Sequence, residues 1–274
     1  MSFDAFFMDG REPGGRRFCV LHPPAGTSPR GAVLYVHPFA EEMNKSRRMA
    51  ALQSRALAAR GFAVLQIDLL GCGDSSGDFA DAGWTAWTHD VVDAAAWLRQ
   101  RFEGPLWLWG LRAGCLLAAD AARRIDGPVD LLFWQPATSG KLLLQQFLRL
   151  KAVSDMIDGE AKGAIEALRR ELAAGRTVEI AGYALAPALA GGLEVATLRP
   201  PPNAGRVVWL DVSSRADAAP SPASAAAVER WRAGGAEVQA EVVAGPAFWQ
   251  TSEIELAPAL IEAGCAALAE AVAS

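Results

Sequence analysis

The stretch PLWLWGLRAGCLLAAD, residues 105–120, constrains the fold more than any other part of the sequence. Its first five residues are all apolar, which is typical of a short strand buried on both faces. Gly110 and Gly114 follow, bracket Arg112, and lead into a helical run that is apolar on nearly every face. A buried strand that turns tightly into a buried helix predicts a parallel sheet covered by helices, with Arg112 in the turn between them.

The same alternation of apolar strands and amphipathic helices extends through most of the chain. It predicts an α/β fold, in which a mostly parallel sheet is flanked by helices on both faces. We expect helices near residues 46–60, 84–102 and 223–233 and after residue 253, and strands at residues 5–8, 17–21, 32–36, 62–69, 105–109, 129–134, 206–211 and 237–243.

The alternation pauses between residues 138 and 202, which are helix-like and contain no strong strand pattern. This interruption predicts a helical cap inserted into a core that is formed by residues 1–137 and 203–274. Ligands of such sheets bind beyond the carboxyl ends of the strands, so we expect the cap to cover the site.

Charge and cysteine usage exclude several classes of partner. The 274 residues carry a formal net charge of −5, so no basic field attracts nucleic acid. The four cysteines, which show neither paired nor metal-like spacing, predict reduced and mostly buried thiols in a cytoplasmic protein: Cys19, Cys72, Cys115 and Cys265.

Membrane insertion, a metal and a cofactor are not expected either. The first residues lack the pattern of a signal peptide, and the most apolar long stretch, residues 181–198, is interrupted by Pro187 and Glu194. The loop at residues 71–77 nearly matches a dinucleotide fingerprint, but Ser76 stands where the last glycine is needed. The sequence carries no signal for an oligomeric state.

Three motifs relate the chain to a known group of proteins. HPFAEEMNKSRRM (residues 37–49), WGLRAG (residues 109–114) and GPAFWQTSEIE (residues 245–255) resemble the family of exosortase A system-associated hydrolase 2. The order of strands and helices over nearly the whole chain is similar to that of α/β-hydrolases in general. The resemblance implies the α/β-hydrolase fold and a bacterial host that makes exopolysaccharide and sorts proteins with a C-terminal anchor signal. The family name implies hydrolysis.

In α/β-hydrolases the turn after the central strand presents a nucleophilic serine, and an acid and a histidine follow in the chain. That nucleophile position falls on Arg112, which cannot attack a carbonyl carbon. The best match for the acid is Asp217, and Asp211 is a weaker match. The histidine is expected in the loop that starts at Gly245, but the histidines of this chain are elsewhere: His22, His37 and His89. The resemblance therefore comes with a degenerate triad, and the ordinary serine mechanism is not available.

The backbone donors of an oxyanion hole survive any change of side chain. In this fold they are the N–H after the nucleophile, here that of Ala113, and one in the loop after the third strand, here that of Phe39 or Ala40. His37 lies at the start of that loop. It is expected to brace the loop through hydrogen bonds or, less simply, to act as a general base.

Arg112 requires an anionic partner in a cleft that holds little water. Two interpretations stay open: an ion pair with Glu41 or Glu42, or bidentate binding of a carboxylate or phosphate ligand next to the helix N-terminus. The charged run at residues 41–48 is the best candidate for other ligand contacts. Cys115 is expected to point into the packing and to be inert.

Five aromatic residues fall at strand ends or in the loops just beyond them. If they converge, they form an apolar pocket for an acyl or prenyl chain under the cap. They are Phe39, Trp109, Trp134, Phe248 and Trp249.

These features leave three hypotheses of function and leave open whether the chain is an enzyme. The first is a binding protein that holds an anionic or acyl small molecule, gripped by Arg112. The second is a slow ester or thioester hydrolase in which Glu41, Glu42 or His37 activates water and Arg112 and backbone N–H groups stabilise the oxyanion. The third is a non-catalytic partner within exopolysaccharide or protein-sorting machinery, which predicts a sizeable exposed apolar patch.

Overall fold

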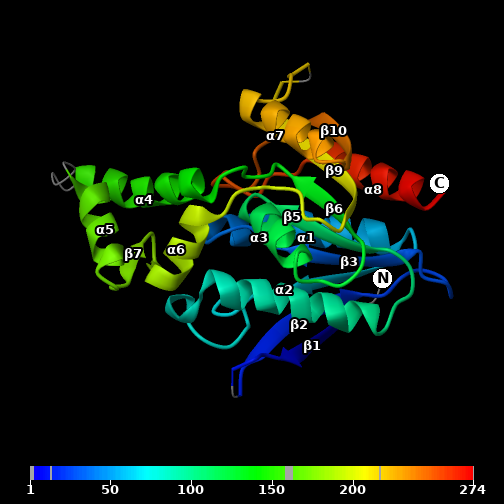
Figure 1. Cartoon of the computed structure of the whole chain (residues 1–274), viewed down its shortest axis with the longest axis horizontal. Helices are drawn as coiled ribbons and strands as arrows, with labels where there is room; N and C mark the ends of the chain where they lie inside the picture. The colour runs from blue at the N-terminus through cyan, green and yellow to red at the C-terminus, as the bar shows by residue number, and fades with distance from the viewer. Residues whose placement is uncertain (1–2, 13, 158–162, 216, 274) are drawn as a thin grey trace.

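The computed structural model describes residues 3–12, 14–157, 163–215 and 217–273, and its centre is an eight-stranded sheet. The strand order is β1-β2-β4-β3-β5-β6-β9-β10, from the bottom to the top of Figure 1. β2 pairs antiparallel with β1 and β4, and the other neighbouring strands are parallel. The strands are β1 (Asp4–Asp9), β2 (Arg16–His22), β3 (Gly31–Val36), β4 (Phe62–Ile67), β5 (Leu106–Leu111), β6 (Val129–Trp134), β9 (Ala204–Ser213) and β10 (Glu237–Ala244).

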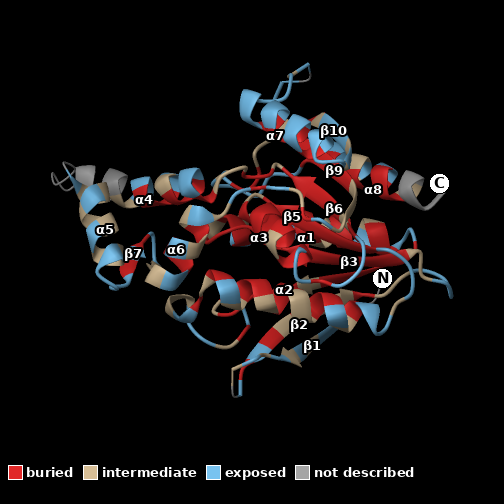
Figure 2. Cartoon of the chain, in the orientation of Figure 1, coloured by how far each residue is buried: buried red, intermediate tan, exposed pale blue. Residues whose placement is uncertain are grey.

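Helices cover both faces of this sheet, and the core is therefore divided into two layers (Figure 2). One layer lies between the sheet and α2 (Trp84–Arg99), α3 (Ala113–Ala122) and α7 (Pro222–Ala233). The other lies between the sheet and α1 (Glu41–Ala58) and α8 (Pro258–Ala273). A one-turn helix, η1 (Phe79–Asp81), precedes α2. The predicted fold class, a mostly parallel sheet flanked by helices, is confirmed.

An insertion separates β6 from β9 and lies on the left-hand side of Figure 1. It contains α4 (Gly140–Ile157), α5 (Ala164–Ala173), a hairpin of β7 (Val178–Ile180) and β8 (Tyr183–Leu185), and α6 (Pro187–Val195). The two ends of the insertion are joined by a bridge between Ser139 and Thr197. The sequence predicted helices here but not the hairpin, because its strands are only three residues long; its turn is made by Ala181 (φ 50°) and Gly182 (φ 81°).

The turn between β5 and α3 has the tight geometry that the sequence predicts. β5 continues to Leu111, so the turn consists of Arg112 alone, with φ 55° and ψ −114°. A Cβ atom at Gly110 would lie 2.6 Å from the Cα of Cys115, and one at Gly114 would lie 2.1 Å from the carbonyl oxygen of Val36. Both glycines are therefore required by the close approach of α3 to the ends of β5 and β3.

This close approach predicts that Gly114→Ala lowers the free energy of unfolding by about 3 kcal/mol, since the clash is with backbone that cannot move away cheaply. Gly191→Ala is the matched control, because Gly191 lies in α6 with no atom within 4 Å of the added Cβ. Helix propensity predicts that this control is unchanged or slightly more stable. Urea unfolding of both variants tests the prediction, and equal midpoints would show that the glycine contact is not tight.

Candidate functional site

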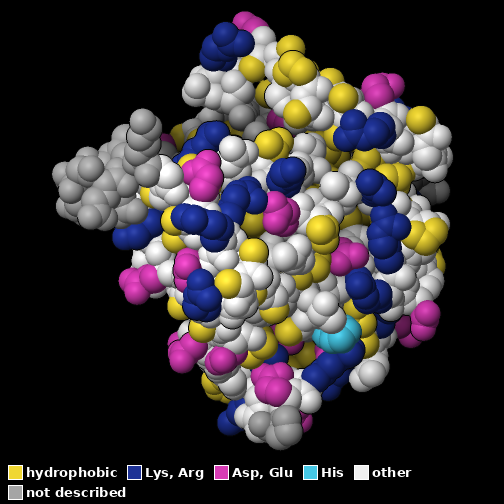
Figure 3. All heavy atoms as spheres, turned by 60° about the vertical axis from the view of Figure 1, so that its left-hand side comes forward, with side chains coloured by type: hydrophobic (Ala, Val, Ile, Leu, Met, Phe, Trp, Pro, Cys, Tyr) yellow, Lys and Arg dark blue, Asp and Glu magenta, His cyan; other side chains and the backbone are white. Residues whose placement is uncertain are grey.

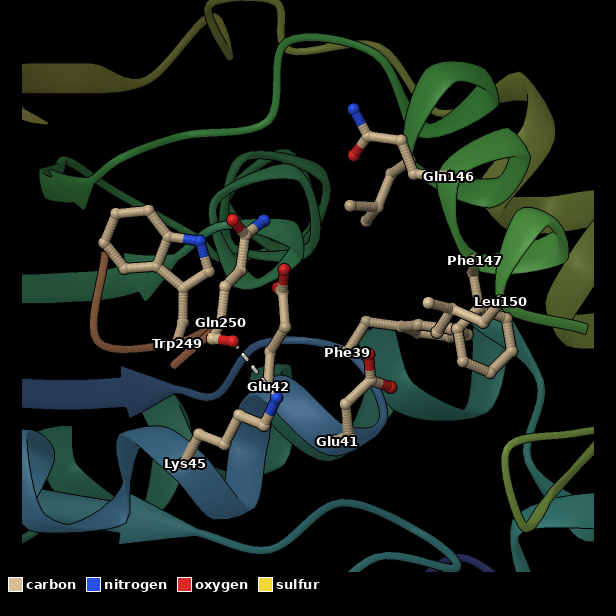
Figure 4. A pocket seen from close by; sticks show the side chains of 10 residues that line it. Phe39, Glu41, Glu42, Lys45, Gln146, Phe147, Leu150, Trp249 and Gln250 are labelled. Carbon is tan, nitrogen blue, oxygen red and sulfur yellow. Dashed lines mark hydrogen bonds between the residues drawn. The ribbon is translucent and has the colours of Figure 1, made fainter. Parts of the chain in front are cut away.

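A cavity of about 270 Å³ lies between the start of α1, the helix α4 and the loop after β10 (Figure 4). Its position beyond the ends of β3 and β10 is where this architecture normally places a ligand. It is lined by Phe39, Glu41, Glu42 and Lys45 from the start of α1, by Leu143, Gln146, Phe147 and Leu150 from α4, and by Trp249 and Gln250 from the loop.

The helix α1 begins five residues earlier than the sequence predicts, at Glu41 rather than near Ser46. Ala40 makes a sharp turn with φ 50° and ψ −128°, which lets the helix start directly behind the loop. Glu41 and Glu42 then occupy the first turn, where the helix dipole stabilises negative charge. The early start places both carboxylates at the cavity, whereas a loop would leave them free to point into solvent.

Arg112 forms an ion pair with Glu42, one of the two partners that the sequence predicts. The distance from Arg112 Nε to Glu42 Oε1 is 3.3 Å, and the side chains are only 13% and 11% exposed. The guanidinium also lies 5.8 Å from the ring centroid of Trp249, in the loop after β10. Arg112 itself does not line the cavity, whereas its two neighbours Glu42 and Trp249 do. Of the two interpretations, the ion pair with a glutamate is the contact that the described chain makes, and binding of an anionic ligand by Arg112 stays a prediction.

Glu42 is a cavity-lining carboxylate whose pKa is shifted by its surroundings. Burial raises its pKa to about 6, an effect that the charges of Arg112 and Lys45 only partly offset and that of Glu41 reinforces. Its Oε2 is buried, as is the Oε2 of Glu41, and neither atom has a hydrogen-bond partner among the described residues. Two buried carboxylate oxygens of residues that line the cavity thus lack a donor within the described chain.

The backbone N–H groups of the expected oxyanion hole are also available. Those of Phe39, Ala40 and Ala113 donate no hydrogen bond to any residue that the structure describes. Ala40, which forms the sharp turn before α1, is 4% exposed. Ala113, which follows the sharp turn before α3, is 5% exposed. An oxyanion hole formed by these N–H groups stays a prediction.

His37 is committed to the backbone and cannot serve as a free base. Its Nε2 accepts a hydrogen bond from the N–H of Leu69 at 3.4 Å, so Nδ1 carries the proton and donates to the carbonyl of Pro38 at 2.8 Å. Burial lowers its pKa, which favours this neutral form. Of the two roles expected for His37, the structure supports the bracing of the loop.

The two acids proposed for the triad do not meet Arg112. Asp217 is exposed in the segment after β9 and is not at the cavity. Asp211 is buried near the end of β9, where its Oδ1 accepts a hydrogen bond from the indole of Trp209 at 3.2 Å and its carboxylate bonds the side chain of Ser224. Its pKa is raised by burial. Neither acid has a histidine to orient.

Two of the five aromatic residues, Phe39 and Trp249, line the cavity, and the prediction that all five converge is wrong. Trp109 and Trp134 do not line the cavity: they are completely buried between the sheet and the helices α1 and α8, with ring centroids 4.7 Å apart. Phe248 packs against Trp134 and Trp249 in the same layer. Side chains alternate between the two faces of a strand, and a strand that is apolar throughout does not reveal which face each one takes.

Sequence reasoning missed the wall of the cavity that α4 supplies. Phe147 is the main contact of this wall, since its ring lies 5.0 Å from that of Phe39 and is nearly perpendicular to it. The signal that could have identified the wall is the helical spacing of Leu143, Phe147 and Leu150, which places them on one face of α4.

The other expectations concern cysteines, metals and membranes. All four cysteines are free and buried, and burial raises the pKa of the Cys115 thiol well above its usual value. Cys115 Sγ points at the carbonyl of Trp134, 3.8 Å away, as expected for a packed and inert thiol. Among the described residues, no group of three His, Cys, Asp or Glu could hold a metal ion. None of the helices there has both the length and the apolar character that a membrane crossing requires.

Comparison with known proteins finds partial matches in sequence. A family model of X-Pro dipeptidyl-peptidase (S15 family) matches residues 18–142. Protein ABHD12B of Homo sapiens is 27% identical over 157 residues, which are 56% of this chain and 42% of that protein. Lysophosphatidylserine lipase ABHD12 of Xenopus tropicalis is 28% identical over 112 residues, 39% of this chain and 28% of that protein. The chain thus spans less than half the length of these curated relatives.

Solved structures cover the whole chain. Est1E from Butyrivibrio proteoclasticus with bound ferulic acid superposes with a TM-score of 0.71 and 17% identity, over 98% of this chain and 100% of that one. Mouse α/β-hydrolase domain-containing protein 10 gives a TM-score of 0.61 and 15% identity, over 98% of each chain. The chain is an α/β-hydrolase-fold protein.

Proposed function

We propose that this protein binds an amphiphilic small molecule non-covalently in the cavity between α1, α4 and the loop after β10, without serine-type hydrolysis. The observation that carries the proposal is the ion pair of Arg112 with Glu42 at the position of the nucleophile. An acyl-type chain would lie against Phe39, Phe147 and Leu150, which are apolar lining residues.

The relatives support an amphiphilic ligand. One is named as a lipase for lysophosphatidylserine, and the superposed Est1E holds ferulic acid. Each of these molecules joins an apolar part to a polar head. The cavity joins the same two features, since apolar side chains of α4 face the carboxylates of α1 across it (Figure 4).

Slow hydrolysis of an ester or thioester by activated water is the second candidate, and two observations favour it. Glu42 has a pKa of about 6, which suits a general base near neutral pH. The N–H groups of Ala40 and Ala113 make no hydrogen bond in the described chain and could stabilise an oxyanion. Binding ranks first because Arg112 holds one oxygen of that same carboxylate.

The closer relationship to exosortase A system-associated hydrolase 2 is also part of the proposal, and so are a cytoplasmic location and a role beside exopolysaccharide or sorting machinery. The motifs that resemble this family contain Glu42, Arg112 and Trp249, which meet in the structure. A purely scaffolding role has less support. In Figure 3, hydrophobic, acidic and basic side chains are interspersed on the face that bears the insertion, without one extended apolar area.

Steady-state assays with aryl esters and acyl thioesters test the proposal. Wild type, Arg112→Ser and Arg112→Ala are expected to remain at the buffer background, because a serine at residue 112 has no histidine to activate it. A serine esterase of the same fold is the positive control. Wild-type turnover well above background that is lost in Glu42→Gln would favour the second candidate over the first.

A further inference from the structure

The cavity contains carboxylate oxygens that the chain itself does not satisfy. Glu42 is 9% exposed, its Oε1 accepts from Arg112, and its Oε2 is buried without a partner in the described chain. Glu41 Oε2 is likewise buried and has no hydrogen-bond partner in the described chain. Both residues line the cavity, and Figure 4 shows the two carboxylates projecting into it from the first turn of α1. A buried carboxylate oxygen without a donor is costly, so a ligand that brings N–H groups gains by pairing with it.

The charges around these oxygens favour a cation. The groups that face Glu42 are Glu41 and Lys45 on α1 and Arg112 on the turn before α3, while α4 and the loop after β10 line the cavity with neutral side chains. Arg112 is occupied by Glu42, and the ammonium of Lys45 is tied to the carbonyl of Gln250 at 3.4 Å. An anionic head group would meet two carboxylates and displace one of these contacts. A cationic head group meets the carboxylates directly.

The aromatic residues around the cavity are compatible with such a head group. Trp249 and Phe39 line opposite sides of it, and Phe147 stands edge-on to Phe39. Aromatic faces attract cations and also accept an apolar chain. The ring of Trp249 already lies next to one guanidinium, that of Arg112, at 5.8 Å from its centroid.

We propose that the head group recognised in this cavity is a primary ammonium carried by an apolar chain, with Glu41 and Glu42 as its acceptors. This inference rests on the proposed binding function and specifies its ligand class. Two unsatisfied acceptors favour a primary ammonium over a quaternary one, since only the former has N–H groups to donate.

Calorimetric titration with probes that share one chain isolates the head group. At pH 7, octylammonium is expected to bind wild type at least tenfold more tightly than octanoate, with octanol and octyltrimethylammonium between them. Between pH 5 and pH 7 the affinity for octylammonium should rise by about tenfold, because Glu42, with its pKa of about 6, becomes ionised over this range while the amine stays protonated.

Variants assign the effect to the two carboxylates. Glu42→Gln, which keeps an acceptor for Arg112, is expected to lose about tenfold in affinity for octylammonium at pH 7 and to lose the pH dependence. Glu41→Gln reports on the second oxygen and remains usable if the first variant folds poorly. Glu253→Gln, an exposed residue in the loop after β10 that does not line the cavity, is the matched control and should bind like wild type.

The outcomes separate this inference from the function on which it rests. Octanoate binding as tightly as octylammonium would overturn the head-group assignment and leave the binding function standing. Binding of octylammonium that is insensitive to both Glu41→Gln and Glu42→Gln would also overturn it. Absence of binding by all four probes would contradict the binding function itself.

Discussion

Glu42→Ala is expected to lower the free energy of unfolding by about 3 kcal/mol, because it leaves the guanidinium of Arg112 buried without an anionic partner. The side chain of Arg112 is 13% exposed, so water can replace only part of the lost interaction. Urea unfolding at pH 7, followed by tryptophan fluorescence, measures the change. Glu41→Ala is the matched control, since the neighbouring carboxylate makes no ion pair with Arg112, and it should shift stability by less than about 1 kcal/mol.

Removal of both partners distinguishes an ion pair from simple packing. The double variant Glu42→Leu with Arg112→Leu is expected to be about as stable as wild type, because a buried pair replaced by apolar side chains often costs nothing. A double variant that is as unstable as the sum of its single changes would show that the two side chains do not act as a pair. In that case Arg112 would have to be stabilised by Trp249 and by the backbone around it.

The fold follows from local patterns that act over a few residues. Apolar strands alternating with amphipathic helices define a parallel sheet, and the glycines at 110 and 114 mark the tight turn because no other residue fits there. This turn fixes Arg112 at the strand end, and one of two nearby glutamates pairs with it, as the charge of a buried guanidinium requires. The sheet, the tight turn and the ion pair can therefore be predicted from residue types and their spacing.

The features that the sequence did not reveal depend on the direction in which a side chain or the backbone points and on contacts between residues far apart in the chain. Trp109 lies in a strand that is apolar at every position, so nothing in the pattern tells which face of the sheet it takes. The early start of α1 depends on the strained turn at Ala40, which no residue preference predicts. Phe147 reaches the cavity only because the insertion folds back over the strand ends, and that placement depends on contacts far apart in the chain.

Trp109→Ala is expected to destabilise the protein by about 4 kcal/mol, a larger effect than that of Glu42→Ala or Gly114→Ala. The indole is completely buried, with ring centroids 4.3 Å from Tyr35 and 4.7 Å from Trp134, and neither neighbour can collapse into the space it leaves. Trp97→Ala is the matched control. It removes the same side chain from a half-buried position on α2, so its effect should be less than half as large. Thermal or urea unfolding of the two variants measures the difference.

Replacing either of two tryptophans, Trp109 or Trp249, by phenylalanine distinguishes an effect on stability from an effect on ligand affinity. Trp109→Phe should lower stability by about 1–2 kcal/mol without changing the affinity for octylammonium, because Trp109 is completely buried and does not line the cavity. Trp249→Phe should weaken that affinity, since its ring forms part of the cavity wall beside Arg112. A loss of affinity in Trp109→Phe that equals the loss in Trp249→Phe would contradict the separation of these two tryptophans. It would mean that the ligand contacts the part of the core between the sheet and α1 in which Trp109 is packed.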